Sequence, residues 1–326
     1  MKIKLLASTL VLAASALAAA GTAMAQSYPN RPIKMVVPWP PAGAVDITAR
    51  QLAERLSARM GQPAIVENRP GATGRVGSQS VVQAAPDGYT LLVMSATVHT
   101  FSPNLSKNFP FDPIDDFSVV SQIVAFPYVM VVPANSKFQS VADVAAAAKA
   151  QPGKISYASF GLGSGPYMVS ELFAMQTGTQ LLHVPYKGAA PAITDLLGGQ
   201  IDFFIDSLPS PLGQIRAGKL RALAVSTPKR SSFLPEVPAM SETIPGFEAT
   251  VWLGIAAPAK TPRDIVNRLH AEIRAISAEP DYIERLRKIG LESVASPSPE
   301  EFRSFLVTQK KYWGDFVQRA KIPLAD

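Results

Sequence analysis

Residues 35–50, MVVPWPPAGAVDITAR, and residues 157–173, YASFGLGSGPYMVSELF, contain the same succession of patterns. In each stretch an apolar run is followed by a turn rich in glycine, proline or serine, and then by an amphipathic segment. This order is typical of a β-strand that leads into an α-helix. The first backbone N–H groups of such a helix have no partner within it and can bind an anion such as a carboxylate. We therefore expect a small anionic ligand held between two lobes, with one such turn in each lobe.

Short apolar strands alternate with helical patterns along the rest of the chain, which favours an α/β fold. Two groups of strand, turn and helix resemble each other, one near Val36 and one near Ile155. The hydrophobic strands at 126–133 and 249–257 are the expected crossovers between two lobes. We predict a two-lobed clamp, each lobe a mostly parallel sheet flanked by helices, with the ligand at the carboxyl ends of the strands.

The pattern also predicts where the elements and the domains lie. Further strands are expected at residues 33–38, 64–67, 90–95, 154–159, 201–205 and 220–226. Further helices are expected at 46–60, 76–84, 141–150, 189–197, 209–217, 262–278, 280–289 and 299–319. The last three helices are expected to pack back on the first lobe. The predicted domains are residues 26–128 with 250–326, and residues 129–249.

The first 25 residues have the pattern of an export signal. Lys2 and Lys4 form a basic start, residues 5–20 are apolar and rich in small side chains, and residues 23–25 (AMA) have the A-x-A form of a cleavage site. A membrane anchor is the competing interpretation, but the apolar run is shorter than the roughly 20 residues that span a bilayer. We expect residues 1–25 to be a signal peptide, cleaved near Ala25.

The composition excludes several functions. The chain has no cysteine, which removes disulfides, thiolate nucleophiles and cysteine-based zinc sites. The three histidines, His99, His183 and His270, are too scattered for a metal site or a triad to be assigned, and His270 is expected at the surface. The formal net charge of +6 is not concentrated in a basic block interleaved with aromatic residues. We therefore expect no bound metal, no cofactor and no nucleic acid.

The turn WPPAG after the first strand is a candidate wall of the ligand site. Pro40 and Pro41 fix φ and lack N–H groups, while Gly43 allows close approach of the backbone. Trp39 places an aromatic ring where a core strand ends. Asp46 stands where a helix N-cap would, and for this residue alone a cap that accepts from its own helix is the favoured interpretation.

The turn GLGSG at residues 161–165 follows Ser159. A serine hydroxyl together with free N–H groups at a helix start is suited to a carboxylate. The turn is not a P-loop, since no Gly-Lys-Ser/Thr follows it, and Pro166 takes the third glycine position of a dinucleotide fingerprint. It is not a nucleophile elbow either, because the glycines lie directly beside Ser164 rather than two residues away. A bare turn is the alternative interpretation.

Asp206 ends the very apolar strand IDFFIDS and precedes a helix. Its carboxylate is expected either to cap that helix or to face the ligand. The position at the carboxyl end of a strand favours the ligand. An acidic group there suits a ligand amine, or orients hydroxyl groups and waters.

The chain resembles a known family in a series of blocks: VVPWPPAGAVDITAR, ENRPGATGRVG, APDGYTLLV, YASFGLGSGPYMVSELF, HVPYKGAAPAITDLLGGQIDFFIDSLPS, GKLRALAVSTPKRSSFLPEVPAMSE and PGFEATVWLGIAAPAKTP. In order and in spacing, over residues 28–326, they resemble the Bug-type periplasmic substrate-binding proteins of tripartite tricarboxylate transporters. The resemblance implies a type II periplasmic-binding-protein fold that closes on a small carboxylated solute and delivers it to membrane permease subunits. It also implies a periplasmic location, and we expect a monomer.

The resemblance places the ligand site on three turns and one strand end. Carried over by position, its residues are Trp39, Pro40, Pro41, Ala42, Gly43, Asp46, Ser95, Ala96, Thr97, Ser159, Gly161, Gly163, Ser164, Tyr167 and Asp206. The sequence departs from the family at two points. Ala42 stands where the family commonly has the first glycine of a pair, and Tyr167 begins a Tyr-Met pair where a His-Leu pair is common. Both departures bear on ligand identity rather than on carboxylate binding.

A receptor for an organic acid is the leading hypothesis, and we expect no enzymatic activity. Di- and tricarboxylates, acidic amino acids, nicotinate-like acids and aromatic carboxylates remain open as ligands, with Trp39 and Tyr167 slightly favouring an aromatic ring. A sensory receptor that presents its closed form to a membrane signalling partner fits the same residues. An exported hydrolase needs a base near a nucleophile, and no Ser–His or paired-carboxylate arrangement can be assigned from the sequence.

Overall fold

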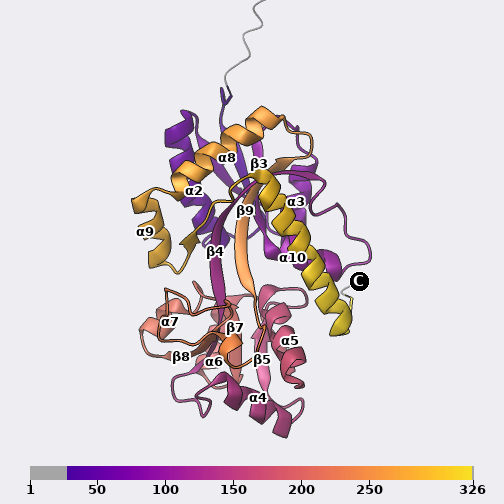
Figure 1. Cartoon of the computed structure of the whole chain (residues 1–326), viewed down its shortest axis with the longest axis vertical. Helices are drawn as coiled ribbons and strands as arrows, with labels where there is room; N and C mark the ends of the chain where they lie inside the picture. The colour runs from indigo at the N-terminus through magenta and orange to yellow at the C-terminus, as the bar shows by residue number, and fades with distance from the viewer. Residues whose placement is uncertain (1–27, 325–326) are drawn as a thin grey trace, which may run out of the picture.

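The computed structural model describes residues 28–324, and the predicted signal peptide lies outside them. The protein has two lobes stacked along its long axis, joined where two long strands run side by side (Figure 1). The first lobe contains β1 (Ile33–Val37), β2 (Ala64–Asn68) and β3 (Thr90–Ser95), and the second contains β5 (Ser156–Ser159), β6 (Leu182–Pro185), β7 (Phe203–Ser207) and β8 (Leu220–Val225). The long strands are β4 (Phe117–Pro133) and β9 (Thr250–Pro258).

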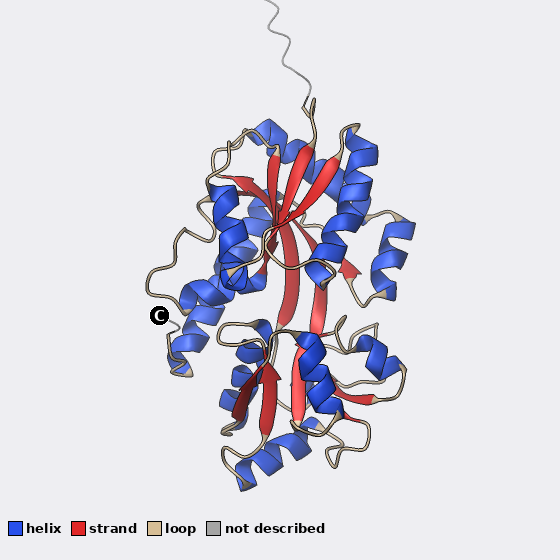
Figure 2. Cartoon of the chain, turned by 180° about the vertical axis from the view of Figure 1, so that it is seen from behind, coloured by secondary structure: helices blue, strands red, loops and turns tan. Residues whose placement is uncertain are grey.

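Helices cover both faces of the sheets (Figure 2), which confirms the predicted α/β clamp. The helices of the first lobe are α2 (Ala44–Met60), α3 (Arg75–Val82), α8 (Arg263–Ser277), α9 (Pro280–Lys288) and α10 (Pro299–Arg319). Those of the second lobe are α4 (Val141–Ala150), α5 (Gly165–Thr177), α6 (Ala189–Leu197) and α7 (Leu212–Arg216). Short turns of helix are η1 (Ala72–Gly74), η2 (Thr97–Phe101), η3 (Ser102–Asn104) and η4 (Met240–Glu242). Among residues 28–324, no helix combines the length and apolar character needed to cross a membrane.

Each lobe has parallel strands, but the sheets are mixed. β1 is parallel to β2 and β3, and β5 is parallel to β6 and β7. β9 is antiparallel to β3 and β4, while β4 is antiparallel to β7 and β8. The two-residue strand β10 (Glu292–Ser293) also pairs with β4. Because β4 leaves the first lobe and β9 returns to it, these two neighbours run in opposite directions.

The strand β4 takes part in both sheets. Its residues 117–127 pair with β9, and from Tyr128 onward it pairs with β7 and β8. Pro127 is opposite Thr250, the first residue of β9. We therefore retain 26–128 with 250–326, and 129–249, as the proposed domain boundaries.

Strand β4 begins at Phe117, nine residues before the predicted start, and β6 was not predicted. The first half of β4 carries polar residues and has register shifts near Val119 and Gln122, where β-bulges interrupt the alternation. β6 lies at the end of the sheet and is largely exposed, so it lacks a hydrophobic pattern. Both features hide a strand from sequence periodicity.

The C-terminal helices pack back on the first lobe, as predicted. α8 contacts β4 and α2, and its residues Leu269, Ile273 and Ile276 are fully buried. Burial of each such side chain stabilises the fold by about 1.5–3 kcal/mol. His270 of the same helix was expected at the surface, but it is buried and its Nε2 lies 2.9 Å from the Ser296 carbonyl oxygen.

Helix α10 packs closely on β9. The ring of Trp252 meets the edge of Phe302, with ring centroids 5.8 Å apart. Gly254 lies beside this contact, and a β-carbon there would come within 2.3 Å of Phe302 Cζ. Only a residue without a side chain therefore lets α10 approach the sheet.

We predict that Gly254→Ala lowers the free energy of unfolding by about 1–3 kcal/mol, because the added methyl group displaces Phe302 from a close-packed contact. Gly213→Ala is the matched control, since a β-carbon at this position inside α7 would meet no neighbouring atom within 4 Å. Denaturant unfolding followed by circular dichroism measures both. Equal stability of Gly254→Ala and the wild type would contradict the packing argument.

Candidate functional site

The carboxyl ends of the parallel strands in both lobes point to the junction between the lobes. β9 starts at the junction with Thr250 and runs away from it, and Ser95, the last residue of β3, pairs with Leu253. β3 and its parallel neighbour β1 therefore end toward the junction. In the second lobe, Ser207 at the end of β7 pairs with Tyr128, which orients β7 and β5 in the same way. Open α/β sheets commonly bind ligands at these ends.

The turn between β1 and α2 forms one side of this junction. Trp39 is half-buried and packs against two hydrophobic clusters, one within the first lobe and one that spans both lobes, while the next four residues of the turn (Pro40, Pro41, Ala42 and Gly43) are exposed. The Trp39 indole packs against Gly74, because a β-carbon added to Gly74 would be 3.4 Å from Trp39 Cζ2. Ala42 has φ = 66°, a left-handed conformation that costs a residue with a side chain roughly 1–2 kcal/mol.

Asp46 holds this turn in place and does not cap its own helix. Its Oδ2 accepts from the Ala42 N–H at 3.0 Å and from Arg50 Nε at 2.9 Å. Asn68 Nδ2 donates to Asp46 Oδ1 at 2.8 Å and to the Trp39 carbonyl at 3.0 Å. Burial would raise the pKa of Asp46, but these hydrogen bonds outweigh it and lower the pKa below its usual value. The predicted cap is thus wrong, and Asn68 and Arg50 are supporting residues that sequence reasoning missed.

The turn after β3 contains the second group of predicted residues. Ser95 and Ala96 are buried, Thr97 is half-buried, and η2, which begins at Thr97, is a π-helix. Such segments occur frequently at functional sites. His99 in η2 is fully buried with its Nδ1 2.7 Å from the Pro113 carbonyl oxygen, and burial lowers its pKa to about 4.

The turn between β5 and α5 is braced by its own serines. Ser159 Oγ accepts from the Gly161 N–H at 2.9 Å. Ser164 Oγ accepts from the Phe160 N–H at 3.2 Å and donates to the Gly161 carbonyl at 2.7 Å. Both hydroxyl groups therefore shape the turn. Gly163 also lies in this turn, where a β-carbon would come within 2.9 Å of Leu105 Cδ1 of the first lobe.

The structure brings together a Ser–His pair that the sequence did not reveal. Ser159 Oγ lies 2.5 Å from His183 Nε2, because β5 and β6 are adjacent strands. The imidazole is stacked on Tyr157 (centroids 5.2 Å apart) and meets the edge of Tyr167 (5.0 Å). Burial lowers the pKa of His183. Ser159 is 0% exposed, so the pair fits a brace of the turn better than an accessible nucleophile.

Asp206 lies at the end of β7, beside the point where β4 passes between the lobes. It is 2% exposed, and its Oδ1 accepts from the Ser207 N–H at 2.7 Å. Its Oδ2 has no hydrogen-bond partner among the described residues. Burial raises the pKa of Asp206 to about 6. Tyr128 of β4, which sequence reasoning missed, packs against the first residue of α5. A β-carbon on Gly165 would lie 2.1 Å from the Tyr128 hydroxyl oxygen.

The site residues thus fall into two sets. Asp46, Ser159 and Ser164 are hydrogen-bonded within their own turns. By contrast, the buried polar atoms near the junction that have no hydrogen-bond partner among residues 28–324 include Trp39 Nε1, Ser95 Oγ and Asp206 Oδ2. Such groups usually have a partner, and leaving one without costs about 1–3 kcal/mol.

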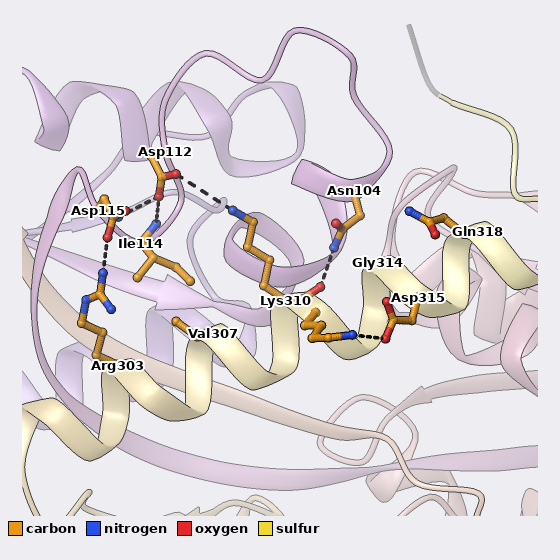
Figure 3. Close-up of a pocket in the computed structure, with 11 residues that line it drawn as sticks. Asn104, Asp112, Ile114, Asp115, Arg303, Val307, Lys310, Gly314, Asp315 and Gln318 are labelled. Carbon is orange, nitrogen blue, oxygen red and sulfur yellow. Dashed lines mark hydrogen bonds and ion pairs between the residues drawn. The ribbon is translucent and has the colours of Figure 1, made fainter.

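A hollow of about 420 Å³ lies elsewhere, between α10 and the segment that follows η3 (Figure 3). Its charged side chains neutralise one another. Arg303 pairs with Asp115, Lys311 Nζ is 2.7 Å from Asp315 Oδ2, and Lys310 Nζ is 4.0 Å from Asp112 Oδ2. This hollow therefore offers no excess charge to an anion and is not our candidate site.

Known proteins resemble this chain over most of its length. A family described as "Tripartite tricarboxylate transporter family receptor" matches residues 48–322. Protein BugT of Bordetella pertussis is 36% identical over 296 residues, which cover 90% of each chain. The solved structure of Rpa4515 of R. palustris with adipate has a TM-score of 0.84 at 32% identity, covering 91% of this chain and 99% of that one. MatC from Rhodopseudomonas palustris, with bound malate, has a TM-score of 0.80 at 28% identity, covering 89% and 100%.

The family match covers more than half of the chain, and the structural relatives share the arrangement of both lobes. The chain therefore belongs to the tripartite tricarboxylate transporter receptor family.

Proposed function

We propose that this protein binds a small dicarboxylate at the junction of its lobes and delivers it to the membrane permease of a tripartite tricarboxylate transporter. The observation that carries the proposal is the opposition of strand ends: β1 and β3 of one lobe and β5 and β7 of the other all end toward the junction. The export-signal pattern of residues 1–25 supports a periplasmic location.

The site would bind the two carboxylates through two helix starts, one in each lobe. α2 and α5 follow β1 and β5, so their first turns lie at the junction. At α5 the N–H groups of Gly165 and Tyr167 are not used within the helix, and Pro166 between them has none. Adipate and malate, the ligands of two structural relatives, each carry a carboxylate at both ends. A dicarboxylate fits a site with two such anion-binding ends.

Side chains without partners would complete the site. The Trp39 indole N–H and the Ser95 hydroxyl supply donors from the first lobe, and Asp206 lies on the second. A solute that contacts both lobes stabilises the arrangement in which they face each other. The proposed site residues are the fifteen predicted from the sequence, of which Asp46, Ser159 and Ser164 act through the shape of their turns rather than by contact with the ligand.

We predict that adipate or malate raises the melting temperature of the mature protein, whereas the corresponding diamides do not. A ligand at one hundred times its Kd adds about 2.7 kcal/mol to the free energy of unfolding, which corresponds to a rise of about 5 °C. A thermal-shift assay on protein unfolded and refolded to remove co-purified solute measures this. No response to any member of a dicarboxylate panel would contradict the proposal.

We predict that Asp206 makes stability fall as the pH rises from 4 to 7. With its pKa raised from 3.8 to about 6 by burial, the folded protein keeps a proton that the unfolded chain loses in this range. Ionisation of the buried carboxyl therefore costs the folded state up to about 3 kcal/mol by pH 7. Asp206→Asn removes this contribution, so urea unfolding of wild type and variant should diverge with increasing pH. Parallel pH profiles would contradict the assignment.

The same substitution tests whether Asp206 faces the ligand. At pH 7.5 the ionised carboxyl repels an anionic solute, whereas an amide does not. Asp206→Asn is therefore expected to bind adipate more tightly than the wild type at pH 7.5, and the difference should shrink at pH 5. Calorimetric titration measures the affinity of both proteins for the same adipate solution at each pH. The ratio of the two affinities is then independent of the ionisation of adipate itself. An affinity ratio that does not change with pH would remove Asp206 from the site.

A further inference from the structure

A second hollow lies on the side of the molecule where α9 of the first lobe faces α7 of the second (Figure 1). It measures about 660 Å³, and we call it the α7–α9 groove. Arg216, the last residue of α7, lines one wall. The other wall comes from α9, with Pro280, Ile283, Glu284, Arg287 and Lys288.

The groove exists only where the two lobes meet. Arg216 Nη1 donates a hydrogen bond to the Lys288 carbonyl oxygen at 3.0 Å. Just beyond α9, Gly290 packs on the second lobe, where a β-carbon would be 3.1 Å from Leu212 Cδ2 and 3.3 Å from Leu208 Cγ. Because its walls belong to different lobes, the shape of the groove depends on how the lobes are placed relative to each other.

The groove carries an excess of positive charge. Lys288 Nζ pairs with Glu284 Oε1 at 3.0 Å. Within residues 28–324, neither Arg216 nor Arg287 has an acidic partner, and both are exposed. A guanidinium group with free N–H donors prefers a carboxylate, which it can bind through two parallel hydrogen bonds. The groove thus offers two such groups to an acidic partner.

Two acidic residues at the start of α9, Asp281 and the preceding Glu279, face the first lobe, and Glu284 is the one acidic side chain among the groove-lining residues. Asp281 forms an ion pair with Arg55 of α2, and Glu279 Oε2 lies 3.5 Å from Arg55 Nη1. Tyr282 and Leu286 are buried beneath the helix. The acidic start of α9 therefore anchors it to the first lobe, and its basic end is left beside α7.

The α7 wall of the groove is connected to the candidate site. α7 begins six residues after Asp206, and Leu212 N donates to the Leu208 carbonyl at 3.2 Å, so the segment between them is short and ordered. A solute that changes the placement of the lobes changes the distance between Arg216 and α9 as well. A partner that fits the groove can thereby distinguish the placement of the lobes with a bound solute from their placement without one.

We propose that the α7–α9 groove is a docking surface for an acidic segment of the membrane permease, which recognises the lobes in the arrangement described here. The proposal rests on the proposed transport function. Charge complementarity at such a surface accelerates association and selects the partner, even where the contact is small and transient.

The test is uptake of the cargo by a strain of the source bacterium that lacks this gene and is complemented with variants of the full chain. The double variant Arg216→Glu with Arg287→Glu reverses the charge of the groove. Its matched control, Lys149→Glu with Lys154→Glu, makes the same change of net charge on exposed residues at the far end of the second lobe. The groove variant is expected to lose uptake at least tenfold, while its melting temperature and its calorimetric affinity for the cargo stay at the wild-type values.

Other results would overturn the proposal in distinguishable ways. Wild-type uptake by the groove variant, or an equal loss in the control, would exclude a specific docking role. If the wild type itself does not restore uptake, the transport function fails, and the docking proposal fails with it. Co-sedimentation with phosphatidylglycerol vesicles that the groove variant abolishes would assign the groove to a lipid headgroup instead of a protein segment.

Discussion

The structure depends on the antiparallel pairing of β4 with β9. A single strand, β4, exchanges β9 for β7 and β8 at Tyr128, so it belongs to the sheets of both lobes. The parallel or antiparallel direction in which the other strands pair, starting from β4 and β9, decides which of their ends faces the junction. Since parallel neighbours share a direction, the pairing of Ser95 with Leu253 and of Ser207 with Tyr128 brings four strand ends together. The candidate site is therefore positioned by backbone hydrogen bonding, independently of the side chains proposed to bind the ligand.

Much of the fold could be predicted because its signals are local. The helices at 141–150, 189–197 and 299–319 have the predicted bounds, since capping residues and apolar spacing mark them within a few turns. The strand at 90–95 is equally well marked. The antiparallel placement of β4 and β9 in the sheets could not be predicted, because it follows from pairing between residues more than a hundred positions apart.

The side-chain contacts of the candidate site could not be predicted for the same reason: they join residues that are distant in the sequence. The turns that sequence reasoning selected follow β1, β3 and β5, which end toward the junction, but it assigned the wrong partners to Asp46 and found no partner for Ser159. Asn68 and His183 come from neighbouring strands, 22 and 24 positions along the chain. Only the strand order reveals such contacts. Whether these turns bind the ligand stays a prediction.

Some residues of the candidate site hold the turns in shape and others have no partner, and this difference bears on how the fold accommodates different solutes. Asp46, Ser159 and Ser164 form hydrogen bonds that hold backbone N–H groups in place, so in the proposed site they would support carboxylate binding without contacting the variable part of a ligand. Ligand selectivity would then depend on groups outside this framework. Asp206 is the strongest of these, because a buried carboxyl whose pKa is near 6 changes from hydrogen-bond donor to anion within a narrow range of pH. In the proposed site, a substitution at Asp206 would change which ligand is preferred while leaving the turns, and hence the clamp, intact.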